Sequence, residues 1–128
     1  MKIHWLTIPL IGLLLAGCAS VTVTRDLNDQ QLATTGEKTV AHLHGDIYGY
    51  YLFGLWPLFT GNPANDNGIA LFSDTVTEEA AVDMVTRKSK DLGATKTTDL
   101  SSRTDSTGRN TLFLVWYYDV QVSGNALK

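Results

Sequence analysis

Two histidines and an aspartate, His42, His44 and Asp46, alternate along one stretch of β-forming sequence. On a strand they would share one face, about 6.6 Å apart, because a strand rises about 3.3 Å per residue. Two imidazoles and a carboxylate suit zinc, copper or nickel. The same alternation is also typical of a solvated strand face, which is the interpretation we favour, with metal binding as the alternative.

Asp46 and Asp119 would form a carboxylate pair if their strands were neighbours, although nothing in the sequence sets the distance between them. Paired carboxylates can do acid–base work. The sequence contains no serine nucleophile elbow, no phosphate-binding glycine loop and no dinucleotide-binding glycine pattern. We therefore expect a protein that is not an enzyme, with no catalytic residues and no cofactor.

Residues 48–59 are dense in aromatic and aliphatic side chains. Core packing is the default interpretation of such a stretch. A binding or oligomer surface, or contact with a membrane surface, are the alternatives, because exposed aromatic patches mark interfaces. The Trp56-Pro57 corner between Leu55 and Leu58 is where we expect an exposed apolar knob. The candidate partner-binding residues are Tyr51, Phe53, Trp56 and Phe59.

The composition bounds the class of protein. The 128 residues are 44 % hydrophobic and 18 % charged, which is too apolar for a disordered chain. The formal net charge of −3 argues against a nucleic-acid partner, since such proteins usually carry a basic excess. A single cysteine excludes an internal disulfide and a multi-cysteine zinc site.

The N-terminus has the layout of a secretory signal peptide. Lys2 precedes a mostly apolar run over residues 3–16, which is shorter than the roughly 20 residues of a membrane-spanning helix. Leu15-Ala16-Gly17-Cys18 then resembles the lipobox of bacterial lipoproteins. The alternatives are an ordinary signal peptide with a chance cysteine or a short N-terminal anchor.

The lipobox resemblance covers residues 1–18 only and implies a diacylglyceryl thioether on Cys18. It also implies cleavage after residue 17 and acylation of the new N-terminus. Because Ala19 rather than an aspartate follows, the family's sorting rule implies the periplasmic face of the outer membrane. Several acyl chains, at about 0.8 kcal/mol per buried methylene, would make this anchoring effectively permanent.

The expected elements form a small domain over residues 38–128. We predict a strand over 38–55 and a helix over 75–92, which starts with a capping box of Thr75 and Glu78 and ends at Gly93. An edge strand over 94–101, a polar turn over 103–110 and a central strand over 111–123 complete it. Residues 18–37 are interpreted as the lipidated cysteine and a polar tether, in which residues 20–24 suit a short strand.

This order predicts the α+β class: an antiparallel sheet of three to four strands with one helix packed across it. Leu92-Gly93-Ala94 before a hairpin, and an apolar strand ending in residues 120–126, resemble small uncharacterised periplasmic lipoproteins and small heavy-metal-binding domains. That resemblance also implies a compact α+β domain.

Together these features predict a lipid-anchored, non-enzymatic binding or structural module with an envelope protein or peptidoglycan as its partner. The alternative is a periplasmic metal or small-ligand binder that uses His42, His44 and Asp46.

Overall fold

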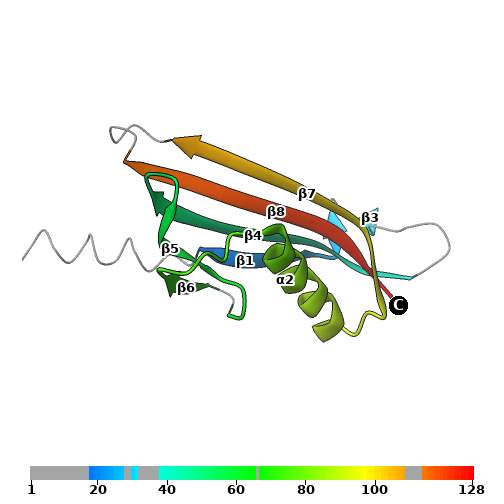
Figure 1. Cartoon of the computed structure of the whole chain (residues 1–128). Helices are drawn as coiled ribbons and strands as arrows, with labels where there is room; N and C mark the ends of the chain where they lie inside the picture. The colour runs from blue at the N-terminus through cyan, green and yellow to red at the C-terminus, as the bar shows by residue number, and fades with distance from the viewer. Residues whose placement is uncertain (1–17, 28–29, 32–37, 66, 109–113) are drawn as a thin grey trace, which may run out of the picture.

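The computed structural model describes residues 18–27, 30–31, 38–65, 67–108 and 114–128. Its main feature is a six-stranded antiparallel sheet crossed on one face by a helix (Figure 1). Two long strands, β4 (Thr39–Leu52) and β8 (Val115–Leu127), lie at its centre and pair along their length. The edge strand β7 (Lys96–Gly108) pairs with β8.

The other side of β4 is shared between two strands. β1 (Ala19–Thr24) pairs with residues 42–47, and β5 (Trp56–Asn62) pairs with residues 49–52. The short β6 (Gly68–Leu71) then pairs with β5. A separate two-stranded sheet joins β2 (Asp26–Leu27) to β3 (Gln30–Gln31).

The helix α2 (Glu78–Asp91) begins one turn later than predicted. Its N-cap is Thr77, whose hydroxyl accepts from the Ala80 N–H at 3.2 Å. The expected cap at Thr75 was wrong, because the Thr75 hydroxyl donates to the Gly61 carbonyl at 2.5 Å and so ties the approach to the helix onto β5. Acidic side chains in the first turn and basic ones in the last suit the helix dipole.

The core lies between α2 and one face of the sheet. Strand alternation directs odd-numbered residues of β4 and even-numbered residues of β8 towards the helix. The helix contributes Ala81, Met84 and Val85, all buried. A Cβ at Gly45 would lie 2.5 Å from Val85 Cγ2, so this close approach of helix to sheet requires glycine. The buried strand residues of this core are Ala19, Ala41, Leu43, Ile47, Val120, Val122 and Ala126.

The α+β class fits, but the sheet is larger than the three to four strands predicted. The tether interpretation was wrong for residues 19–24, which form β1 and place Ala19 in the core. The short strand proposed within that stretch is therefore present. Residues 103–108 pair with β8 rather than forming a turn. The central position of β8 and the edge position of β7 are confirmed.

Candidate functional site

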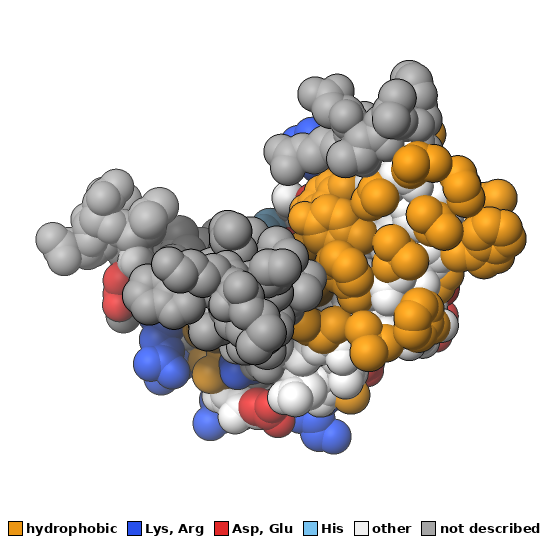
Figure 2. Space-filling model, turned by 90° about the vertical axis from the view of Figure 1, so that its left-hand side faces the viewer, with side chains coloured by type: hydrophobic (Ala, Val, Ile, Leu, Met, Phe, Trp, Pro, Cys, Tyr) orange, Lys and Arg blue, Asp and Glu red, His pale blue; other side chains and the backbone are white. Residues whose placement is uncertain are grey.

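One end of the sheet exposes large apolar side chains. They come from the turn between β4 and β5, from the start of β5 and from the end of β6. Figure 2 looks onto this end and shows hydrophobic side chains gathered over much of its surface. The apolar tip, as we call it, consists of Phe53, Leu55, Trp56, Leu71 and Phe72, which are between 49 % and 77 % exposed.

Two of the tip residues have a backbone conformation that L-amino acids rarely adopt. Phe53 has φ 53° and Phe72 has φ 54°, and they are two of the four non-glycine residues with positive φ in the described part of the chain. The left-handed region costs such a residue roughly 1–2 kcal/mol. Strain of this kind is concentrated at functional sites. The turns therefore hold two phenylalanine rings in water at a cost in stability.

The tip is also poor in charge. Between Asp46 and Asp74 the sequence contains one charged residue, Asp66. An apolar surface without charges can be dehydrated at low cost, because burying an unpaired charge is what makes dehydration expensive. The tip is therefore suited to contact with an apolar partner.

The residues predicted to bind a partner separate into two groups. Phe53 and Trp56 are exposed, and their rings meet edge to face with centroids 6.1 Å apart. Tyr51 is buried on the helix side of β4, and its hydroxyl donates to Asp74 Oδ1 at 2.6 Å. It is therefore not available to a partner, and that prediction was wrong. Phe59 is half-buried against Tyr50.

Sequence reasoning missed two members of the tip. Leu71 ends β6 and Phe72 follows it, and both side chains are exposed. The available signal was their position next to Ser73 and Asp74, which ends an apolar run in polar residues. The expected exposed knob at the Trp56-Pro57 corner is present, with Leu55 as its most exposed residue.

Cys18 lies at the end of β1 that is closer to the tip. The Tyr48 N–H donates to the Cys18 carbonyl at 2.8 Å, and β1 then runs antiparallel to β4, away from the tip. β4 continues four residues beyond Tyr48 to Leu52, which is about 13 Å at 3.3 Å per residue. Cys18 and the tip therefore occupy the same half of the molecule.

The Cys18 side chain is buried in the full-length chain. Burial raises the pKa of the Cys18 thiol, and a hydrogen bond with Tyr48 acts in the opposite direction. A lipid attached to Sγ would require the side chain to leave this contact. Cys18 remains the predicted lipidation site.

The two aspartates singled out in the sequence meet on the face of the sheet opposite α2. In the register of β4 and β8, Asp46 faces Gln121 and Asp119 faces Tyr48, so the aspartates are diagonal neighbours. Gln121 Nε2 donates to Asp119 Oδ2 at 2.9 Å. The Oδ1 atoms of both aspartates are buried without a hydrogen-bond partner among the described residues.

Burial, a hydrogen bond with Asp119 and the charge of Asp119 together raise the pKa of Asp46 to about 7. Burial and the charge of Asp119 also raise the pKa of the nearby Tyr117 hydroxyl. Two carboxylates this close do not both ionise readily. The pair can therefore hold one proton near neutral pH.

His42, His44 and Asp46 lie in a row along β4 and do not converge. His42 Nδ1 is 2.8 Å from Asn125 Oδ1, while His44 is exposed. Within residues 18–128, leaving aside the stretches that the structure does not describe, no group of three His, Cys, Asp or Glu side chains is placed to hold a metal ion.

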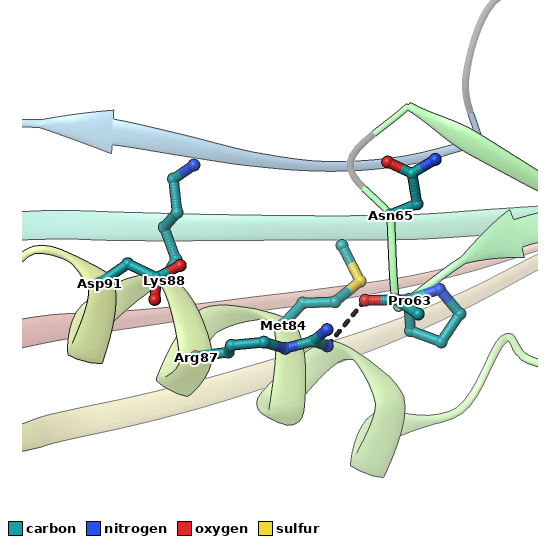
Figure 3. Close-up of a pocket in the computed structure, with 7 residues that line it drawn as sticks. Pro63, Asn65, Met84, Arg87, Lys88 and Asp91 are labelled. Atoms are coloured by element: carbon teal, nitrogen blue, oxygen red, sulfur yellow. Dashed lines mark hydrogen bonds between the residues drawn. The ribbon is translucent and has the colours of Figure 1, made fainter.

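A shallow hollow of about 260 Å³ lies between α2 and the loop from β5 to β6 (Figure 3). Arg87 spans it, donating to the Pro63 carbonyl at 2.7 Å and to Asp83 Oδ2 at 2.5 Å. These bonds fasten the loop to the helix and engage the guanidinium group. The described residues that line the hollow are Pro63, Ala64, Asn65, Met84, Arg87, Lys88 and Asp91.

Comparison of the chain with protein-family models, with curated proteins and with solved structures gives no match. In the described residues, no helix has the length and apolar character needed to cross a membrane.

Proposed function

We propose that the protein is a lipid-anchored module of the bacterial cell envelope that binds another envelope component through the apolar tip. Its anchor is a lipid on Cys18, and its place is the periplasmic side of the outer membrane. The observation that carries the proposal is the apolar tip itself, an uncharged cluster of exposed side chains in the same half of the molecule as Cys18.

Three features support binding by the tip. Contiguous exposed apolar surface in a soluble domain marks interaction sites. Phe53 and Phe72 are exposed although their backbone is strained, which stability alone does not favour. The polar sequence around the tip is almost free of charge, so a partner can cover it without desolvating ions.

The anchor is tested by producing the full chain in a Gram-negative bacterium, beside a Cys18→Ser variant. We expect the wild-type chain in the outer-membrane fraction, cleaved before Cys18 and heavier by the mass of its acyl groups. Cys18→Ser should keep residues 1–17 and lack those groups. A Cys18→Ser protein that is still processed and fractionates like the wild type contradicts the anchor.

Binding by the tip is tested by placing a photoreactive amino acid at Leu55 and, as a matched control, at Leu100. Leu100 is also exposed, at 46 %, but lies on β7 outside the tip. Irradiation of cells should give a covalent adduct, to lipid or to protein, from position 55 and not from position 100. Equal labelling at both positions, or none at 55, contradicts a binding role for the tip.

A further inference from the structure

We propose that the envelope component bound by the apolar tip is the lipid bilayer that holds the anchor, so that the tip inserts its side chains into the membrane interface. This inference rests on the proposed function, because it takes Cys18 as the attachment point of the lipid. It identifies the partner by its chemistry, a lipid surface.

The spacing between Cys18 and the tip is as large as the thickness of one headgroup layer or larger. The β4–β5 turn of the tip lies about 13 Å beyond the level of Cys18 along β4, counted as four residues at 3.3 Å each. Leu71 is level with Tyr50 and lies two residues, or about 7 Å, beyond Cys18. The headgroup region is about 5–8 Å thick per leaflet, from a total of about 40–45 Å around a core of about 30 Å. With Cys18 at the outer edge of the headgroups, Leu71 reaches the boundary of the hydrocarbon and the β4–β5 turn extends past it.

The side chains of the tip suit that depth. Trp56 has an amphipathic ring of the type that is enriched at membrane–water interfaces. Phe53, Leu55 and Phe72 would leave water for the acyl boundary, as the apolar faces of peripheral anchors do. The strained turns at Phe53 and Phe72 project aromatic rings that a bilayer would cover.

The distribution of charged residues along the sheet also favours a membrane contact at the tip. Lys38, Lys96 and Lys128 gather at the opposite end, where the Lys128 N–H donates to the Lys38 carbonyl at 3.0 Å and Lys96 pairs with Leu127. The residues of the apolar tip are thus uncharged, whereas three lysines lie at the opposite end of the sheet. A membrane contact at the tip leaves these ammonium groups in water.

The bilayer is favoured over a protein partner for two reasons. A lipid on Cys18 keeps the tip within a few nanometres of the membrane, so the effective concentration of this partner is permanently high. The interface of a bilayer accepts tryptophan and apolar side chains. Among the tip residues there is neither an arginine nor any other charged side chain.

The test uses the full chain purified from outer membranes and reconstituted in vesicles of phosphatidylethanolamine and phosphatidylglycerol. The sequence has three tryptophans, at positions 5, 56 and 116. Trp5→Phe and Trp116→Phe therefore leave Trp56 as the reporter, whether or not residues 1–17 are removed. We expect its emission to shift to shorter wavelength and to fall at least two-fold when the lipids carry bromine on their acyl chains.

The matched control moves the reporter out of the tip by adding Trp56→Phe and Leu100→Trp. It should stay on the vesicles with emission typical of water and without quenching. A vesicle-bound protein in which Trp56 behaves like this control would falsify the membrane contact while leaving the anchor intact. Circular dichroism verifies that the variants fold.

The photoreactive group at Leu55 gives a second readout that needs no tryptophan substitution. Lipid adducts support the bilayer, and adducts to a polypeptide overturn it in favour of a protein partner. Failure of the anchor is recognised separately, because the mass of the purified wild-type chain would then lack the acyl groups expected on Cys18. In that case quenching of Trp56 still decides whether the tip meets lipid.

Discussion

Asp46 and Asp119 lie diagonally across the two central strands, each with a buried Oδ1 atom that no described residue hydrogen-bonds. Burial, together with a hydrogen bond and the charge of Asp119, raises the pKa of Asp46 to about 7. In an unfolded chain an aspartate has a pKa of about 3.9. Folding therefore favours the protonated form of Asp46, and the free energy of unfolding depends on pH through this group.

The sign follows from linkage. A carboxyl whose pKa is raised in the folded state contributes most to the free energy of unfolding below about pH 4. This contribution is lost as the pH rises through about 7. Asp46→Asn should therefore raise the free energy of unfolding at pH 8, by about 1–2 kcal/mol after allowance for solvent screening. The gain at pH 4 should be smaller. Urea denaturation at the two pH values measures the difference.

Asp91→Asn is the matched control for this variant, since Asp91 is an exposed carboxylate at the end of α2. It should leave the difference in stability between pH 4 and pH 8 as in the wild type. If the free energy of unfolding differs between pH 4 and pH 8 by the same amount in Asp46→Asn as in Asp91→Asn, the coupling between Asp46 and Asp119 does not cause the pH dependence of stability.

The close packing of α2 on β4 depends on Gly45. Gly45→Ala places a methyl group against Val85 Cγ2 and should lower the free energy of unfolding by about 1–3 kcal/mol, the usual range for overpacking. Adding Val85→Ala removes the clash, so the second substitution should cost less in the Gly45→Ala chain than in the wild type. A double-mutant cycle by urea denaturation checks this, and additive effects would contradict it.

The N-cap of α2 is Thr77. Thr77→Ala should lower the free energy of unfolding by about 1 kcal/mol, because the Ala80 N–H loses its acceptor. Thr77→Ser keeps a hydroxyl and should retain most of the stability, as seen in thermal melts followed by circular dichroism. Equal losses in the two variants would place the cap elsewhere.

Phe72 is exposed and has a positive φ, so its removal should not weaken the fold. Phe72→Gly should leave the free energy of unfolding unchanged or raise it by up to about 1 kcal/mol, since glycine adopts this backbone without strain. The same variant should show weaker quenching of Trp56 by brominated lipids. Phe72→Ala keeps the strain and should be less stable than Phe72→Gly, whereas the reverse order would contradict a strained backbone.

Local patterns in the sequence predicted much of the fold. The helix follows from apolar residues at helical spacing, and Ala81, Met84 and Val85 are buried as that spacing requires. Alternation along residues 111–123 predicted a central strand, and β8 lies between β4 and β7. The resemblance of residues 15–18 to a lipobox also depends only on local sequence.

Pairing between distant segments was decided by the tertiary structure. Ala19–Thr24 has too few apolar residues to be recognised as part of a core, but β4 offers an unpaired edge whose N–H and C=O groups β1 satisfies. Likewise, Asp46 and Asp119 are 73 positions apart, and only the β4–β8 register brings them together.

The apolar tip was likewise determined partly by the sequence and partly by the tertiary structure. The sequence by itself determined that residues 48–59 are rich in aromatic and aliphatic side chains and contain no charged residue. Only the tertiary structure decided that Tyr51 is buried while Trp56, Leu71 and Phe72 are exposed together. The physical reason is that side-chain alternation is a local property of a strand, whereas burial depends on which elements cover each face.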